Sequence, residues 1–179
     1  MVEHDAGEAI SRLQRLADSM SPNLAVVHDS RFDFVVWNAA FSRIRTDPAE
    51  LAPGRRNLLW WMFTDERNRA AMHRWEPAAR AILSQFRAVV GRRPDDQRLA
   101  AIVAGLTEAS AEFRIWWSEY PVQDFRPATI GIEHPEAGPI ELELYQLRLV
   151  ENPDLLLVVQ LPVTDEDRRR IADQLDAPS

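Results

Sequence analysis

The sequence predicts an α+β protein, with a five-stranded antiparallel sheet and a helical segment inserted between its second and third strands. Near both ends of the 179-residue chain, apolar residues alternate with polar ones, which is typical of half-buried strands. Through the middle, apolar residues recur every three or four positions, which is typical of amphipathic helices. No internal repeat or low-complexity segment divides the chain, so we expect a single domain over residues 1–179.

The N-terminal part predicts a helix, a hairpin and a second, short helix. Residues 8–20 form the first helix, which ends before Pro22. Its apolar face consists of Ile10, Leu13, Ala17 and Met20. Strands at 24–28 and 32–37 are joined by the turn "DSR", and "NAAFSRIR" predicts the short helix.

The middle of the chain predicts several helices. Pro77 must either kink the first of these or begin a new one. Asp95 and Ser110 are the expected N-caps of the two helices that follow. The residues expected to face inward from the three helices are Met72, Trp75, Ala79, Ile82, Phe86, Val89, Leu99, Ile102, Val103, Leu106, Phe113, Trp116 and Trp117.

The C-terminal part returns to the strand period. Strands are expected at 128–134, 139–150 and 154–161, and the apolar phase of the second one slips near Gln146, which suggests a bulge. Thr164 and Asp167 predict a capping box for a final polar helix. Residues 163–179 therefore form a polar helix and tail after the sheet.

Composition narrows the possible functions. The formal net charge of -7 disfavours non-specific attraction to nucleic acid or to an anionic membrane. The chain has no cysteine, which excludes disulfides and fits a reducing compartment. No apolar run approaches the roughly 18 residues of a membrane span, and the N-terminus is not a signal peptide. We therefore expect a cytoplasmic protein with no membrane association.

No pattern of a catalytic or metal site is present. The four histidines lack metal-ligand spacing, and the chain has no nucleophile elbow, dinucleotide fingerprint or phosphate-binding loop. Paired carboxylates such as Asp95-Asp96 lie where helix caps and solvated strand faces are expected. We expect no enzyme activity, no metal and no cofactor.

Tryptophans and arginines are concentrated in two segments, "RNLLWWMFTDERNRAAMHRWE" and "EFRIWWSEY". They are either an indole-rich core or the wall of a cavity. Arg87 follows the inward-facing Phe86, and Arg114 follows Phe113, so each guanidinium should flank an apolar face. Such a cation is costly without a carboxylate or a bound anion as its partner.

The same segments resemble a known family. "RNLLWWMFTDERNRAAMHRWE", "LSQFRAVVGRRPDDQRLAAIVAGLTEASAEFRIWWSEYPV", "HPEAGPIELELYQL" and "VVWNAAF" are similar to the MmyB-like transcription regulator ligand-binding domain. The family region covers about residues 8–162. The matching family positions are Trp37, Asn38, Asn57, Phe63, Asp65, Trp75, Glu76, Arg87, Phe113, Arg114, Trp117, His134 and Pro135. The chain departs from the family pattern at Glu66, at Tyr120-Pro121 and in the approach to His134.

The resemblance implies a PAS-like sensor domain that usually follows a helix-turn-helix and is associated with a fatty-acid ligand. Nothing before Ser21 is long enough for a helix-turn-helix, so we expect no DNA-binding domain in this chain and DNA contact only through such a domain. The expected ligand-binding residues are Trp37, Asn57, Trp61, Phe63, Trp75, Phe86, Arg87, Arg114 and Trp117.

The favoured function is therefore the sensing of a small apolar anion such as a fatty acid, whose carboxylate pairs with Arg87 or Arg114. The alternative is a protein-interaction or dimerisation module without a small ligand. In either case we expect a homodimer, with the apolar face of the first helix as its seam.

Overall fold

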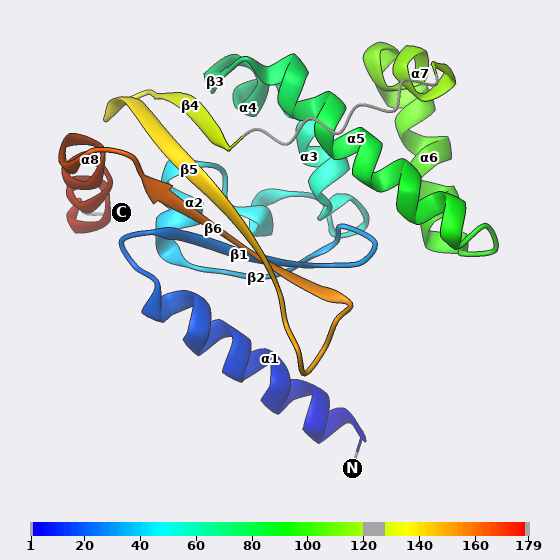
Figure 1. The fold of residues 1–179 in the computed structure, drawn as a ribbon, viewed down its shortest axis with the longest axis horizontal. Helices are drawn as coiled ribbons and strands as arrows, with labels where there is room; N and C mark the ends of the chain where they lie inside the picture. Colours follow the sequence, from blue (N-terminus) through cyan, green and yellow to red (C-terminus); the bar gives the residue numbers. More distant parts are fainter. Residues whose placement is uncertain (1, 120–127, 178–179) are drawn as a thin grey trace.

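The computed structural model describes residues 2–119 and 128–177. Within these residues the chain forms eight α-helices and a curled antiparallel sheet of six strands (Figure 1). The helices are α1 (Val2–Ser19), α2 (Ala39–Ile44), α3 (Leu58–Thr64), α4 (Glu66–Ala71), α5 (Trp75–Arg92), α6 (Gln97–Ala109), α7 (Ala111–Ser118) and α8 (Asp165–Asp176). The strands are β1 (Leu24–Asp29), β2 (Phe34–Trp37), β3 (Met72–His73), β4 (Thr129–His134), β5 (Gly138–Arg148) and β6 (Leu155–Pro162).

The sheet has the order β2-β1-β6-β5-β4-β3, so the prediction of five strands was wrong by one. The additional strand is β3, whose Met72 and His73 pair with Ile132 and Gly131 of β4. It lies between α4 and α5 and is two residues long, too short to show the alternation that identifies a strand in a sequence. The other five strands are those that the sequence predicts.

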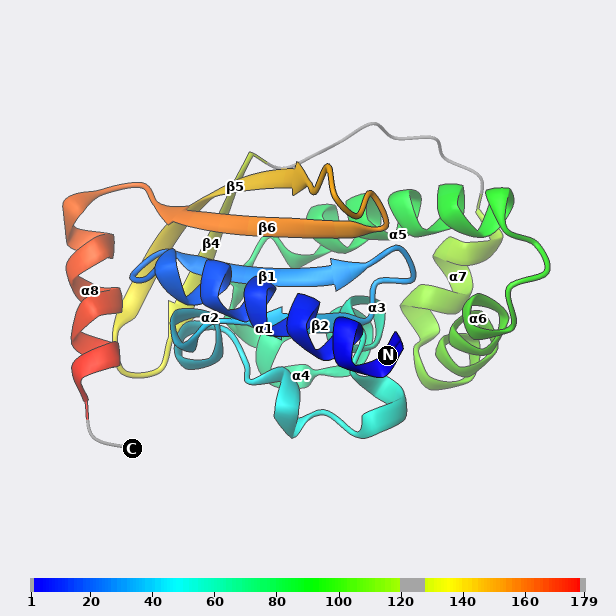
Figure 2. The same cartoon turned by 90° about the horizontal axis from the view of Figure 1, so that it is seen from below.

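Alternation along the strands builds a core on each face of the sheet. On the inner face, Leu24 and Val26 of β1 pack with residues of the helices between β2 and β4. On the outer face, Ala25 and Val27 pack with Ala17 of α1. Figures 1 and 2 show α1 crossing the outer face, whereas α3 and α5 lie against the other side. Strands with both faces covered are buried on both sides, as the burial of β1 shows.

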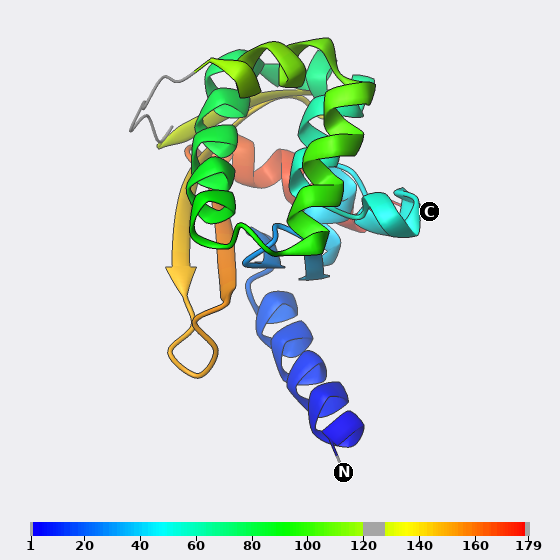
Figure 3. The same ribbon diagram turned by 90° about the vertical axis from the view of Figure 1, so that its right-hand side faces the viewer.

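The remaining helices extend this arrangement at its two ends. Seen from the side, α6 and α7 continue the helical layer beyond the sheet and close a ring with α3 and α5 (Figure 3). At the opposite end, α8 packs against α2 and β5 and buries Ile171 in the inner core. No helix in the described part of the chain is long and apolar enough to cross a membrane.

Short polar side chains begin most of the helices. The predicted N-cap Ser110 and the capping box of Thr164 with Asp167 are confirmed. The predicted cap Asp95 was wrong by one residue, because Asp96 is the side chain that accepts from the backbone of α6. Pro77 lies in the first turn of α5, where backbone N–H groups have no partner within the helix, so its missing N–H costs no hydrogen bond. Of the two predicted possibilities, Pro77 therefore marks the start of a helix and not a kink.

The expected bulge near Gln146 was also wrong. Strand β5 pairs with β6 without interruption from Leu142 to Arg148. The apolar phase changes there because Tyr145 and Leu147 occupy the outward positions of β5, each 47% exposed, although Tyr145 also borders the cavity described below. Gln146 keeps the inward phase of Leu144, and this polar inward residue belongs to the site described next.

Candidate functional site

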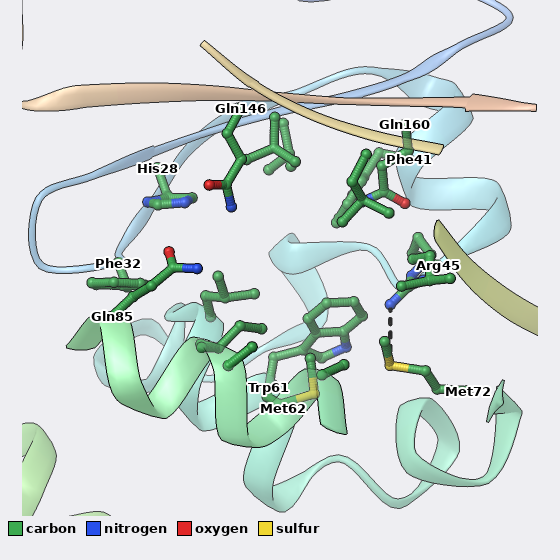
Figure 4. Close-up of a pocket in the computed structure, with 18 of the residues that line it drawn as sticks. His28, Phe32, Phe41, Arg45, Trp61, Met62, Met72, Gln85, Gln146 and Gln160 are labelled. Carbon is green, nitrogen blue, oxygen red and sulfur yellow. Dashed lines mark hydrogen bonds between the residues drawn. The ribbon is translucent and has the colours of Figure 1, made fainter. Parts of the chain in front are cut away.

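A cavity of about 390 Å³ lies between the inner face of the sheet and the helical layer. Its volume is within the range of small-molecule sites, which is about 300–1,000 Å³. Figure 4 shows the sheet above it, with α5 and α3 below. The lining residues are Val26, His28, Phe32, Phe34, Phe41, Arg45, Leu58, Trp61, Met62, Met72, Ala78, Ala81, Ile82, Gln85, Ala128, Ile130, Leu144, Tyr145, Gln146, Val158 and Gln160.

The space exists because one face of α5 carries small side chains. Ala78, Ala81, Ile82 and Gln85 follow the helical spacing of one face, and all four line the cavity. Ala78 and Ala81 are buried, and neither methyl group reaches far toward the sheet. A helix that presents alanine at two of these positions leaves room that leucine or phenylalanine would fill.

Arg45 brings a positive charge into this apolar wall. It lies four residues after the buried Phe41, immediately after α2, and therefore continues the buried side of that helix. Burial lowers the pKa of Arg45 from its usual value to about 10. The guanidinium still carries its charge at neutral pH, because even this lowered pKa lies well above 7.

The contacts of Arg45 are all with uncharged groups. Its Nη2 donates to Asn68 Oδ1 at 3.3 Å and reaches Met72 Sδ at 3.9 Å. Its guanidinium carbon lies 5.0 Å from the centre of the Trp61 ring, a cation–π contact. Its Nη1 is buried without a hydrogen-bond partner, and no carboxylate in residues 2–119 or 128–177 forms an ion pair with it. A buried cation without a counter-charge is strongly unfavourable.

Two further polar atoms beside Arg45 also lack partners. Trp61 Nε1 and Gln160 Oε1 are buried and make no hydrogen bond with the residues that the structure describes. In Figure 4 these side chains and Arg45 lie together at one end of the cavity. Buried polar groups are nearly always hydrogen-bonded in folded proteins. Arg45 Nη1 and Trp61 Nε1 are donors that a bound anion would satisfy, whereas Gln160 Oε1 is an acceptor and would need a donor.

Of the nine predicted site residues, all of which the structure describes, eight lie outside the cavity wall. Trp61 lines the cavity. Asn57 is fully buried and caps α3, accepting from the Leu59 N–H at 2.9 Å. Trp37 donates from Nε1 to Asp47 Oδ1 and lies outside the cavity wall.

The aromatic residues from Phe63 onward form a solid core between helices. Phe63 makes edge contacts with Trp75 and Phe113, with ring centres 5.9 and 5.3 Å apart. Trp117 stacks on Phe113 at 5.5 Å, and Phe86 contacts Trp117 at 6.0 Å. None of these five side chains lines the cavity. The concentration of indoles therefore has two roles, since Trp61 faces a cavity whereas this group packs α3, α5 and α7.

The two arginines expected at the site bind backbone groups instead. Arg87 donates to the carbonyl oxygens of Trp116, Trp117 and Glu119, at the C-terminal end of α7. Arg114 is exposed and donates to Thr107 O at 3.0 Å. Neither guanidinium lies in the wall of the cavity.

Several of the resembling positions hold helix ends or turns. Asn38 Oδ1 accepts from the N–H groups of Ala25 and Phe41. Asp65 caps α4, and His134 Nδ1 accepts from the N–H of Ala137 at 3.0 Å. Tyr120-Pro121, where the chain departs from the family pattern, lies outside the described residues.

Several polar residues of the cavity were not predicted as site residues, and for four of them the sequence carries a signal. His28, Gln146 and Gln160 each occupy an inward position of a strand, where the preceding inward residues are Val26, Leu144 and Val158. Arg45 has the helical spacing from Phe41. A polar residue in the apolar phase of a strand or helix is the common signal.

No group of three or more histidines and carboxylates in the described ranges could hold a metal ion. Of the described residues that line the cavity, Arg45 is the only one with a full charge. The arrangement offers burial to an apolar molecule and a cation to an anionic group, and the lining residues that the structure describes include no nucleophile beside a base.

Comparison with known proteins agrees with this reading of the cavity. No curated protein matches the chain. The family described as the MmyB-like transcription regulator ligand binding domain matches residues 10–175, which includes every described residue of the cavity wall. Domains of this family bind ligands within transcription regulators, and they are not a class of enzymes. The chain belongs to the MmyB-like transcription regulator ligand binding domain family.

Proposed function

We propose that this protein is a PAS-like sensor domain that binds an aliphatic carboxylate, such as a fatty acid, with its carboxylate at Arg45. The observation that carries the proposal is the Nη1 of Arg45, which is buried in the wall of an apolar cavity without a hydrogen-bond partner among the described residues. The antiparallel sheet with helices between β2 and β4 on its inner face supports the PAS-like assignment.

The free energy gained by burying the aliphatic chain is large enough to give micromolar affinity. Burying about 12 methylene groups at roughly 0.8 kcal/mol each gives about 10 kcal/mol before the costs of association. Loss of translational and conformational freedom reduces this to affinity on the order of micromolar. The carboxylate accepts charge-assisted hydrogen bonds from the Nη1 of Arg45 and the Nε1 of Trp61, two donors of the cavity wall without partners among the described residues.

In a full regulator, occupancy would act by changing how the helical layer packs on the sheet. The cavity is lined by residues of α3 and α5 on one side and of β1, β5 and β6 on the other. A ligand therefore contacts both layers at once and favours the arrangement that fits it. DNA binding would belong to a separate helix-turn-helix domain.

The test is a calorimetric titration of delipidated protein with dodecanoate. We expect Arg45→Met to weaken binding by about 10- to 100-fold, because a hydrogen bond to a charged group contributes about 1.5–3 kcal/mol. Arg114→Met is the matched control, since that guanidinium is exposed and bonds one backbone oxygen. Arg87→Met tests the other predicted position, and its affinity should stay within about twofold of the wild type. Undiminished binding by Arg45→Met, or no binding by the wild type, would contradict the proposal.

A second candidate function is self-association through α1. Most of the predicted dimer surface of α1 packs on the protein's own sheet, because Ala17 is fully buried and Leu13 and Met20 contact the outer face. Ile10 and Leu16, however, are 48% and 37% exposed on α1. We propose that these two side chains contribute to a homodimer contact. Sedimentation velocity of the wild type and of Leu16→Glu tests this, and a wild type that stays monomeric at high concentration would exclude it.

A further inference from the structure

The cavity has a second polar end, opposite Arg45. His28, Gln85 and Gln146 lie together there, with Gln146 reaching down from the sheet and Gln85 reaching up from α5 (Figure 4). The wall between the two ends is apolar and includes Val26, Phe34 and Val158. A purely aliphatic tail would meet three hydrogen-bonding side chains at this end.

The pairing of the strands gives the distance between the two ends. His28 of β1 is opposite Leu156 of β6, and Gln160 lies four residues further along β6. Four residues of an extended strand span about 14 Å at roughly 3.4 Å each. A ligand that reaches from Arg45 to His28 is therefore a chain of medium length.

His28 is a buried, neutral hydrogen-bond acceptor. Its Nδ1 lies 3.0 Å from the carbonyl oxygen of Asp29, and a carbonyl oxygen only accepts, so the ring proton is on Nδ1. Burial lowers the pKa of His28 below 6.5, against smaller opposing effects of the hydrogen bond to Asp29 and of its charge. In this tautomer Nε2 carries a lone pair, and it has no partner in the part of the chain that the structure describes.

The two glutamines provide hydrogen bonds of the complementary kind. Neither Gln85 nor Gln146 has a side-chain hydrogen bond to another described residue. Each amide has two N–H donors and an acceptor oxygen. Gln146 is exposed and Gln85 is half-buried, so this end of the cavity is its opening, and His28, only 4% exposed, lies inside it.

The chemistry of this end selects a hydroxyl group. A hydroxyl donates one hydrogen bond, to an acceptor such as His28 Nε2, and accepts others, from donors such as the glutamine amides. A second carboxylate would face the lone pair of Nε2 with no cation among the described lining residues at this end. A methyl end would leave Nε2 without a partner after the ligand has displaced water.

We propose that the ligand is an aliphatic carboxylic acid with a hydroxyl group at or near the end of its chain, which donates to His28 Nε2. This inference rests on the proposed function, since it assumes that the carboxylate lies at Arg45. It identifies His28 as the residue that determines specificity, with Gln85 and Gln146 supporting the same hydroxyl group.

The test compares two ligands of equal length with the delipidated protein. We expect ω-hydroxydodecanoate to bind at least about tenfold more tightly than dodecanoate, because a site built to bond a hydroxyl discriminates against the analogue without it. In His28→Phe this advantage should disappear or reverse. The phenylalanine keeps a ring for the stacking contact with Phe32, which has ring centres 5.2 Å apart.

Controls separate this inference from the proposed function. His73→Phe replaces an exposed histidine of β3 and should keep the wild-type preference. Arg45→Met should weaken both acids by a similar factor. If dodecanoate binds and the hydroxyl gives no advantage, or if His28→Phe keeps the advantage, the hydroxyl inference is wrong and the carboxylate site stands. If neither acid binds the wild type, both proposals fail. The wild-type comparison decides the question even if His28→Phe does not fold.

Discussion

The residue that matters most for the proposed site is an arginine whose neighbours give it no counter-charge. Arg45, Arg87 and Arg114 all lie close to a buried phenylalanine in the sequence. Arg87 finds three carbonyl oxygens at the end of α7, a segment about thirty positions away. Arg45 finds an amide oxygen, a thioether and an indole face. Sequence periodicity predicts which arginines flank a core, but partners supplied by a distant segment depend on the tertiary fold.

This difference predicts a stability effect of unusual sign. We expect Arg45→Met to stabilise the ligand-free protein by about 1–3 kcal/mol, because a charge that has no counter-charge among the described residues is replaced by an apolar chain of similar length. Urea unfolding of delipidated protein measures the change. Arg98→Met is the control with the opposite expectation, since Arg98 forms an ion pair with Asp33 at 2.6 Å. A loss of stability in ligand-free Arg45→Met would show that the charge is satisfied within the protein.

At the scale of elements, the sequence predicts which strands and helices form, and their residue phase predicts which side faces inward. The five longer strands and the N-cap Ser110 follow from local pattern. Strand β3 does not, because its two residues form a strand only by pairing with β4. The alternation of β1 also predicts that His28 faces inward, but it does not predict that His28 lines a cavity. An inward-facing polar residue bonds to other protein groups in a filled core, whereas beside a cavity it can contact a ligand. The size of the side chains on the opposite element determines which of the two applies.

The side chains of helix α5 determine where the space below the sheet is filled and where a cavity remains. Its face toward the sheet carries Ala78 and Ala81. Because these side chains are small, His28 and Gln160 on the opposite side border a cavity and do not pack against α5. The same helix uses Phe86 to fill the core next to α7. The sequence pattern shows that both parts of α5 are apolar. Alanine, however, fills much less of the space between a helix and its neighbour than phenylalanine does. The predicted aromatic site residues fall mostly on the filled side for this reason.

At the scale of the whole molecule, the sheet separates a ligand-binding side from an outer side. The inner core surrounds the cavity, whereas the outer core joins α1 to the sheet through small aliphatic residues such as Ala17 and Val27. Strands β1 and β6 belong to both cores, since their alternate residues face opposite sides. A change in the inner packing would reach the outer side through the strands that the two cores share, and the sheet itself would limit how far it extends.

Hydrogen–deuterium exchange tests how far the effect of a ligand extends. We expect dodecanoate to slow exchange in α3 and α5, which contribute Trp61, Ala81 and other lining residues, because a filled cavity suppresses local opening of its walls. Exchange in residues 7–12 of α1, which are exposed, should stay unchanged and serves as the internal reference. Ala81→Leu is the matched variant, since its larger side chain occupies the cavity and should abolish the ligand effect while keeping the fold. Equal protection of α1 and α5 would mean that the ligand stabilises the molecule as a whole, and that the two sides of the sheet do not respond separately.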